Sequence, residues 1–288
     1  MATKGIHFTD FYQPSGAGTT GGEYQNVFGM LPTNGGISFK NTHDNLNYFT
    51  MGSQLNRLGY YGQAFHNNTY TYYSRDKYLT NLGYNYKGLG GGLEVTKQWP
   101  ESDVEVVDLS TADFVGQQPF SVYYMTISGH REFTFGGNYI ASKNKDLVAH
   151  LPYSSNVRAY LATQLELEMS MELLLQRLEE AGVLDNTVIV LTADHYPNGL
   201  TAEEMGELLG VKDVAEELVA GYYAGRTHSI IDIRDCALSP EKNEEILRTV
   251  LAFAEEYKIS AYDEGTGTGL LRHLLVREGF SSGQILIC

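Results

Sequence analysis

The chain has 288 residues, 42% of them hydrophobic and 19% charged, which is the composition of a globular protein with a sizeable core. Its 35 acidic residues outnumber 20 Lys and Arg, and the formal charge of −15 argues against nucleic-acid binding, which needs a basic surface. Two cysteines cannot build a disulfide framework. The longest apolar run, 187–193, is far shorter than the ~20 residues of a spanning helix, and no signal-peptide pattern opens the sequence.

Three segments predict the framework of the first part of the chain. Residues 119–127 (PFSVYYMTI) are β-branched and aromatic, which is typical of a buried strand. Residues 154–181 carry Leu and Met at helical spacing and predict one long helix. Residues 186–192 (NTVIVLT) are almost continuously apolar and predict a strand buried on both faces. This order indicates a crossover unit of a parallel sheet, and residues 201–204 (TAEE) form a capping box that starts another helix.

Two adjacent polar residues follow the second predicted strand. Ligands of open parallel sheets bind beyond the carboxyl ends of the strands, so these positions are candidates for chemistry. Asp194 and His195 offer a carboxylate and an imidazole, a pair that suits a divalent metal ion. For an isolated pair, an N-capping Asp beside a surface His is the simpler interpretation.

Two further histidines and an arginine occupy comparable positions. His130 follows the strand that ends at Ile127, while His66 follows the run 59–65, with Arg75 nine residues farther on. Each alone is explained by a structural role in a loop. If the strands are adjacent, the histidines and the arginine together would make a site for an anion and a metal ion.

A glycine-rich segment lies near the start of the chain. Residues 16–22 (GAGTTGG) predict a turn whose backbone N–H groups could face an anion. A threonine hydroxyl beside a divalent cation, here Thr19 or Thr20, can act as a nucleophile. The Gly-Lys-Ser/Thr of a P-loop is absent, and a plain flexible loop is the alternative.

In this order the motifs resemble the catalytic domain of lipoteichoic acid synthases, members of the alkaline phosphatase/sulfatase superfamily. The resemblance covers 1–213 and is carried by GIHFTDFYQPSGAGTTGGEY, AFHNNTYTYYSRDKYLTNLGYNYKGLG, WPESD, YYMTISGH and the stretch from LPYSSN to TADHYPNGLT. It implies an α/β fold with a mostly parallel sheet and flanking helices. In that family the first catalytic strand and the membrane helices precede the segment that this chain's first residues resemble, so we expect this chain to lack both.

The resemblance also implies roles for individual residues. Thr19 matches the family's nucleophile, with Thr20 as the second choice. A single Mn²⁺ or Mg²⁺ ion would be held by Thr19, Asp194 and His195, together with a Glu on the upstream strand. Without that Glu we expect activity to be weak or absent.

The implied substrate is the phosphoglycerol head group of phosphatidylglycerol, bound by His66, Tyr73, Arg75 and His130. The group would pass through a phospho-Thr19 intermediate to a polyglycerol-phosphate acceptor. A sulfatase or phosphodiesterase of the same superfamily is the alternative. The family works at the extracellular face of the bacterial plasma membrane, whereas a chain without signal or anchor is expected in the cytoplasm.

The last part of the chain predicts a small α+β segment. A helix capped by Ser239 runs to about Lys258, a glycine-rich hairpin turn spans 265–269, and strands are expected at 262–264, 270–277 and 284–288. Residues 219–288 resemble the central part of 23S rRNA uracil-5-methyltransferases. The first resemblance passes directly into the second near residues 213–220, which favours a gene fusion, frameshift or assembly artefact. A methyltransferase fragment or an inactive chimeric product is therefore a further alternative, although we expect no nucleic acid as partner.

Overall fold

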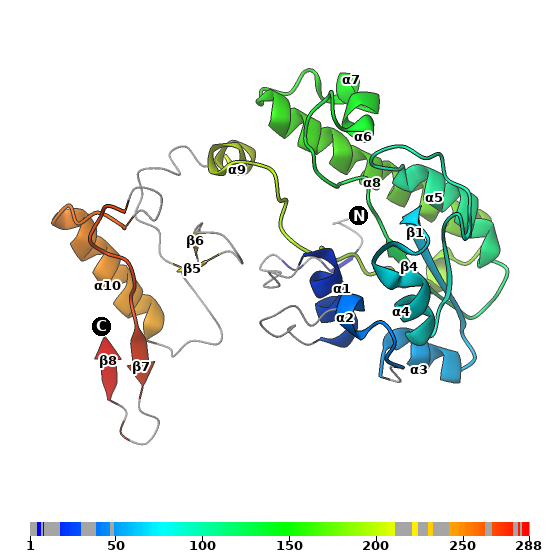
Figure 1. Cartoon of the computed structure of the whole chain (residues 1–288), viewed down its shortest axis with the longest axis horizontal. Helices are drawn as coiled ribbons and strands as arrows, with labels where there is room; N and C mark the ends of the chain where they lie inside the picture. The colour runs from blue at the N-terminus through cyan, green and yellow to red at the C-terminus, as the bar shows by residue number, and fades with distance from the viewer. Residues whose placement is uncertain are drawn as a thin grey trace. The chain divides into compact units, whose positions relative to one another are not determined.

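The chain folds into two compact units, Met1–Lys212 and Asp213–Cys288. The computed structural model describes residues 5–6, 8, 18–29, 39–46, 49–210, 221–223, 230–232, 242–262, 267–278, 282 and 284–287. Figure 1 shows both units, coloured from blue at the N-terminus to red at the C-terminus. Each unit is described by itself.

The first unit is built on a parallel sheet of four strands in the order β3-β2-β1-β4. The strands are β1 (Tyr61–Thr69), β2 (Asn85–Leu89), β3 (Gly92–Leu93) and β4 (Phe120–Met125). β1 lies between β2 and β4, and Tyr61 pairs with Phe120 while Gln63 pairs with Asn85. The predicted α/β fold with a mostly parallel sheet is confirmed, and β4 confirms the strand predicted at 119–127.

Helices pack against this sheet and against one another (Figure 1). They are α1 (Thr19–Phe28), α2 (Phe39–Thr42), α3 (Met51–Arg57), α4 (Arg75–Asn81), α5 (Asp103–Ser110), α6 (Tyr139–Lys143), α7 (Lys145–Val148), α8 (Ser155–Glu180) and α9 (Ala202–Leu209). Of these, α6, α7 and α9 contact α8. The long helix predicted at 154–181 is confirmed as α8, which Ser154 caps through its side chain. The predicted capping box is also present, since Thr201 and Glu204 bond each other's backbone N–H at the start of α9.

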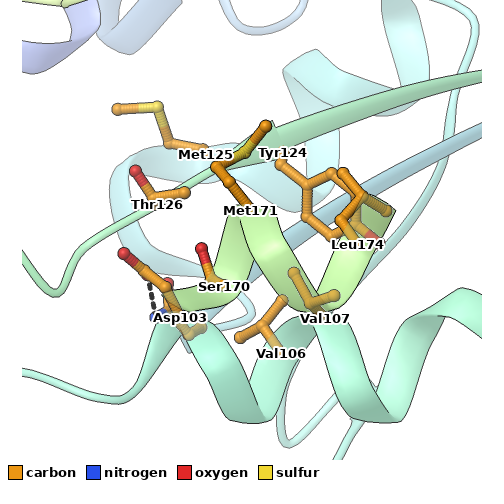
Figure 2. Close-up of a pocket in the computed structure, with 10 residues that line it drawn as sticks. Asp103, Val106, Val107, Tyr124, Met125, Thr126, Ser170, Met171 and Leu174 are labelled. Atoms are coloured by element: carbon orange, nitrogen blue, oxygen red, sulfur yellow. Dashed lines mark hydrogen bonds between the residues drawn. The ribbon is translucent and has the colours of Figure 1, made fainter. Parts of the chain in front are cut away.

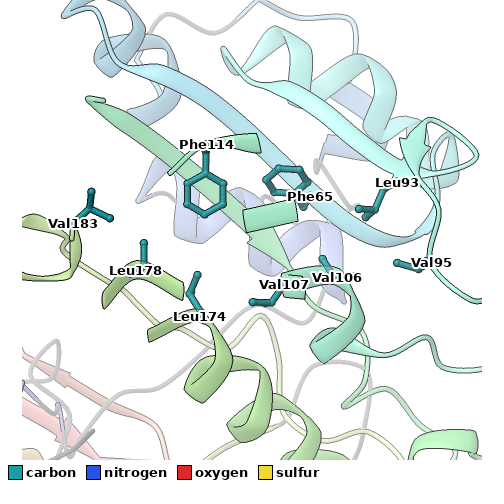
Figure 3. Close-up of a cluster of buried hydrophobic side chains, with 9 residues drawn as sticks. All are labelled: Phe65, Leu93, Val95, Val106, Val107, Phe114, Leu174, Leu178 and Val183. Carbon is teal, nitrogen blue, oxygen red and sulfur yellow. The ribbon is translucent and has the colours of Figure 1, made fainter. Parts of the chain in front are cut away.

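The core lies on both faces of β1. Phe65 belongs to a cluster with Phe114, Leu174 and Leu178, which packs α5 and α8 against one face of the sheet (Figure 3). The neighbouring Ala64 belongs to a second cluster, which contains aromatic side chains of α2, α4 and β2. Successive residues of a strand point to opposite faces of the sheet. Because Phe65 and Ala64 belong to different clusters, β1 is covered on both faces.

The strand predicted at 186–192 is wrong. The residues that follow the 3₁₀ turn Leu184–Asn186 pair with no strand in the described chain, and Val188 and Val190 are 88% and 80% exposed. Hydrogen bonds hold the segment near its ends, from the Thr187 hydroxyl to the carbonyl of Val183, just before the 3₁₀ turn, and from Asn26 to the Ala193 carbonyl. A strand needs a neighbouring strand for its backbone hydrogen bonds as well as an apolar sequence. This segment has the apolar sequence but no neighbouring strand among the described residues.

The second unit has one helix and two short antiparallel strand pairs. They are α10 (Asn243–Glu256), β5 (Gly221–Tyr223) with β6 (Ile230–Asp232), and β7 (Val276–Glu278) with β8 (Ile285–Ile287). α10 confirms the predicted helix, whose proposed cap at Ser239 lies outside the described residues. The strand expected at 270–277 is shorter and begins only at Val276. No strand forms at Tyr262, and the rest of 262–264 lies outside the described residues. Across both units, no described helix is long and apolar enough to cross a bilayer.

Candidate active site

Three predicted residues meet at the start of α1. Thr19 is the first residue of the helix and follows Gly18, whose φ of 67° is left-handed. The glycine-rich segment therefore begins a helix rather than forming the expected turn throughout. The Thr19 hydroxyl oxygen lies 3.5 Å from Nε2 of His195, and Oδ2 of Asp194 lies 3.4 Å from the same nitrogen.

The close approach of these residues depends on a glycine in α1. A Cβ atom on Gly22 would lie 1.9 Å from the backbone oxygen of Asp194, so only glycine lets the two backbones touch. One turn farther along, the side-chain amide of Asn26 donates to the carbonyl of Ala193 at 3.1 Å. The same helix that presents Thr19 thus docks the chain that carries Asp194 and His195.

The ring of His195 is oriented by a backbone carbonyl. Its Nδ1 lies 2.7 Å from the oxygen of Tyr196 and must donate there, because a carbonyl can only accept. In the neutral ring, Nε2 then presents its lone pair to Thr19 and to the carboxylate of Asp194. Metal-binding histidines are commonly fixed in this way.

These three side chains form a donor set that fits one small divalent cation. A cation held between the lone pair of a neutral imidazole and a carboxylate is attracted by both. Within the described ranges, no three His, Cys, Asp or Glu side chains gather, so the hydroxyl of Thr19 would be the third donor beside Asp194 and His195. Hard oxygen donors with one imidazole suit Mn²⁺ or Mg²⁺.

Arg75 lies buried beside α1. It begins α4, its side chain is 1% exposed, and its Nη2 lies 2.9 Å from Oε2 of Glu23. No described residue accepts from its Nε or Nη1. The guanidinium of Arg75 also lies 5.8 Å from the centre of the Tyr73 ring, so the structure brings these two predicted residues together.

His66 lies within β1 and not after it, because the strand continues to Thr69. Its Nδ1 donates to the carbonyl of Met125 on β4 at 2.8 Å. Burial and the nearby charge of Arg75 hold the pKa of His66 well below its usual range, so the ring is neutral. Its buried Nε2 is an acceptor with no partner in the described structure.

His130 follows β4, as expected. Its Nδ1 donates to the carbonyl of Arg131 at 2.6 Å, and its ring packs edge-on against Trp99 at a centroid distance of 4.9 Å. Sequence reasoning did not single out Trp99, although it belongs to the motif WPESD. Its partly exposed ring borders the loop that carries His130.

A buried carboxylate ties together the strand ends that carry the two histidines. Asp103, the first residue of α5, accepts from Asn67 at 2.7 Å and from the backbone N–H of Ile127 at 2.9 Å. A cavity of about 30 Å³ lies beside it between β4, α5 and α8 (Figure 2). That volume holds a water molecule and no substrate, so this region supports the site without forming it.

Comparison with known proteins assigns the family. The sulfatase family model matches residues 1–216, so the chain belongs to the sulfatase family. The chain is similar in fold to the crystal structure of the lipoteichoic acid synthase LtaP from Listeria monocytogenes. The TM-score is 0.55 and the identity 18%, over 68% of this chain and 49% of that chain. At this identity the likeness shows the fold, and it confirms the sulfatase-like architecture.

The curated relatives carry another name. An "uncharacterized RNA methyltransferase" of Staphylococcus epidermidis is 27% identical over 128 residues, which are 44% of this chain and 28% of that protein. One from Clostridium tetani is 42% identical over 67 residues, which are 23% of this chain and 15% of that protein. The chain thus spans less than a third of these relatives, in agreement with a resemblance that is confined to part of the sequence.

Proposed function

We propose that the first unit is a metal-dependent phosphoglycerol transferase. Its donor would be phosphatidylglycerol at the outer face of a bacterial plasma membrane, and its acceptor a polyglycerol-phosphate chain. The observation that carries this proposal is that a hydroxyl suited to act as a nucleophile belongs to the same unit as buried polar groups that have no hydrogen-bond partner among the described residues. Thr19 meets His195 and Asp194, while Arg75 and His66 keep buried donors and an acceptor without partners in the described structure.

The free groups match the chemistry of a phosphoglycerol head group. The Nε and Nη1 groups of Arg75 would donate to phosphoryl oxygens, and Nε2 of His66 would accept from a glycerol hydroxyl. Tyr73, against the guanidinium, would form one wall, and His130 with Trp99 would form another. Because Arg75 is already paired with Glu23, its charge alone does not balance an incoming phosphate diester.

The reaction would proceed in two substitutions at phosphorus. A bound Mn²⁺ or Mg²⁺ ion would lower the pKa of the Thr19 hydroxyl and neutralise charge on the phosphoryl group. In the first step the Thr19 oxygen loses its proton and bonds to phosphorus, while the phosphorus–oxygen bond to diacylglycerol breaks and the released oxygen takes up a proton. In the second step the terminal hydroxyl of the acceptor loses its proton and attacks phosphorus, and the phosphorus–oxygen bond to Thr19 breaks, so that Thr19 regains a proton. Arg75 would stabilise the charge on the phosphoryl oxygens in both steps.

The test is turnover of a fluorescent phosphatidylglycerol by the full chain with Mn²⁺, compared with Thr19→Ala and Thr20→Ala. Loss in Thr19→Ala and retention in Thr20→Ala would support the proposal, as would a mass-spectrometric phosphoglycerol adduct on the peptide that contains Thr19. Measurable turnover that is equal in the wild type and Thr19→Ala would refute it. Release of glycerol phosphate to water alone, without transfer to an acceptor, would favour the phosphodiesterase alternative.

A second candidate rests on the names of the curated relatives. Residues 219–288 would be a fragment related to RNA methyltransferases, and a chain that joins such a fragment to the first unit would be an inactive chimeric product. Binding of the full chain to ribosomal RNA fragments, with an affinity that falls steeply as salt rises, would support the RNA-binding form of this candidate. Binding that does not change with salt would count against it.

A further inference from the structure

A buried glutamate in α1 has no part in the reaction described above. Glu23 lies one helical turn after Thr19, and its side chain is 1% exposed. Its carboxylate contacts three side chains from two other elements, namely Arg75 and Tyr78 of α4 and Tyr123 of β4. One side chain therefore links the helix of the nucleophile to the sheet and to the helix of the arginine.

The contacts of Glu23 all come from donors. Nη2 of Arg75 lies at 2.9 Å, the Tyr78 hydroxyl at 3.0 Å from the same oxygen, and the Tyr123 hydroxyl at 3.2 Å from the other oxygen. Burial raises the pKa of Glu23, while the charge of Arg75 and the hydroxyl of Tyr78 lower it. Two buried opposite charges at this distance are stable as a pair, and either one alone is costly.

The ion pair determines where the rest of the guanidinium points. The guanidinium is planar and rigid, so fixing one nitrogen leaves the others little freedom. In Arg75 the nitrogen Nη2 is fixed by Glu23, and the other two nitrogens, Nε and Nη1, are those without partners in the described chain. The carboxylate therefore occupies Nη2 and leaves Nε and Nη1 of the arginine free to donate to a ligand.

Because Glu23 and Thr19 lie on the same helix, fixing Arg75 to Glu23 also fixes its position relative to the Thr19 hydroxyl. Residues four apart lie on one face of an α-helix, about 6 Å apart along its axis. We propose that Glu23 is a positioning residue, which holds the free N–H groups of Arg75 at a set distance from the Thr19 hydroxyl so that both reach one phosphoryl group. The phosphoryl part of this inference rests on the proposed function, whereas the fixing of Arg75 does not.

The same contacts exclude Glu23 as a further metal ligand in this arrangement. Its two oxygens already accept from three donor side chains, and one of these carries a full positive charge. A divalent cation beside Arg75 would meet that charge at close range. Asp194 and His195 have no such competitor among the contacts described.

The test uses the full chain and a matched pair of variants. Glu23→Gln keeps the size of the side chain and removes its charge. Glu166→Gln makes the same change at another fully buried glutamate, which pairs with Lys143 and lies on α8. Both variants should lose stability, so a comparison of the two separates positioning from general loosening of the fold.

The first readout is the ¹⁵Nε–¹H signal of Arg75 in protein labelled only in arginine, assigned through Arg75→Lys. We expect a single sharp signal in the wild type and in Glu166→Gln, and a broadened or shifted one in Glu23→Gln. Should Glu23→Gln fail to fold, Tyr123→Phe removes one of the hydroxyls that hold the carboxylate and should give a smaller change of the same kind. An unchanged Arg75 signal in a folded Glu23→Gln protein would overturn the proposal.

The second readout is the Kd of inorganic phosphate in the presence of Mn²⁺, measured well below the unfolding temperature of every variant. Glu23→Gln also removes a negative charge from beside the guanidinium, which by itself would tighten phosphate binding. We expect the loss of orientation to outweigh this gain and to weaken binding about tenfold or more, with Glu166→Gln leaving it unchanged. Equal binding by the wild type and Glu23→Gln would overturn the positioning role. If the wild type binds no phosphate while the Arg75 signal still depends on Glu23, the fixing of Arg75 stands and the proposed function fails.

Discussion

The carboxylate of Asp103 accepts hydrogen bonds from both the backbone N–H and the hydroxyl of Ser128. Asp103 begins α5, and Ser128 lies just beyond the end of β4. The same carboxylate accepts from Asn67, which directly follows His66 in β1. One buried group therefore sets the spacing between the strand that carries His66 and the loop that carries His130.

We expect Asp103→Asn to lower the free energy of unfolding of the first unit by about 2–3 kcal/mol, because an amide NH₂ would face N–H groups that need an acceptor. Urea unfolding measures this change. Asp108→Asn is the control, since Asp108 lies on the same helix and makes only an exposed ion pair with Arg177. Its effect should stay within about 0.5 kcal/mol, and equal effects of the two substitutions would contradict the role given to Asp103.

Gly22→Ala should destabilise the protein although alanine favours helices. In an open helix position the change would stabilise by about 1 kcal/mol. Here the new Cβ would lie 1.9 Å from the Asp194 oxygen, so α1 must move away from that backbone. We expect a loss of about 1–3 kcal/mol in urea unfolding and a loss of any turnover that depends on Thr19.

The control for this substitution is Gly116→Ala. A Cβ there would have nothing within 4 Å, and its effect should stay within about 0.5 kcal/mol. A Gly22→Ala protein that is as stable as the wild type would mean that α1 and the segment before His195 do not touch.

The sequence predicted those parts of the fold whose causes are local. The periodicity of 154–181 and the capping box at Thr201 act within one or two turns, and the structure has both. The segment 186–192 shows the limit of this reasoning. Its apolar residues suit a strand, but a strand forms only with a partner, and the identity of that partner is not written in the segment itself.

The candidate site was predicted in part, through the resemblance of motifs. The meeting of Thr19 with Asp194 and His195 is present in the structure, while their roles stay predictions. The glycines before Glu23 suggest a loop, so its place on a helix beside Thr19 was not predicted. The signal that could have identified it is its spacing of four from Thr19, which places both on one face if the segment is helical. Its partner Arg75 is 52 residues away, beyond the reach of any local pattern.

The buried tyrosines predict a loss of stability at alkaline pH. Burial raises the pKa of Tyr123 and Tyr78 well above 10, and the charge of Glu23 adds to both shifts. Above about pH 10 the unfolded chain releases these protons and the folded chain keeps them, so stability is present below that pH and is lost above it. Each such tyrosine adds a slope of about 1.4 kcal/mol per pH unit.

Urea unfolding from about pH 8 to about pH 11 measures this slope. Tyr123→Phe should make the decline above pH 10 shallower by up to one tyrosine's share. Tyr139→Phe, at an exposed position, should leave the slope unchanged. Identical slopes for the wild type and Tyr123→Phe would show that Tyr123 does not keep its proton in the folded protein.

His66 predicts a second dependence, at mildly acidic pH. Its folded pKa is depressed by burial and by Arg75, while the unfolded chain binds a proton below about pH 6.5. The stability contributed by His66 is therefore present above that pH and is lost as the pH falls, by about 1.4 kcal/mol per unit. The measurement is the difference in unfolding free energy between the wild type and His66→Gln at about pH 7 and about pH 5.

This difference should shrink as the pH falls, because only the wild type carries the buried neutral ring. The raised pKa of Asp103 acts in the opposite direction at lower pH, but it is common to both proteins and cancels in the comparison. His150→Gln, at an exposed position, should show a constant difference from the wild type. The same pH dependence in both variants would contradict a neutral His66.

The 176 residues between Thr19 and His195 also determine when the site can form during synthesis. A ribosome that adds about 5–20 residues per second needs about 9–35 s to pass from one to the other. Through that interval α1 has neither Asp194 to pack against nor, at first, Arg75 and Tyr123 to pair with Glu23. The surroundings of Thr19 are thus among the last parts of the first unit to assemble, and a pause in translation before residue 195 leaves the chain with its central sheet but without the proposed site.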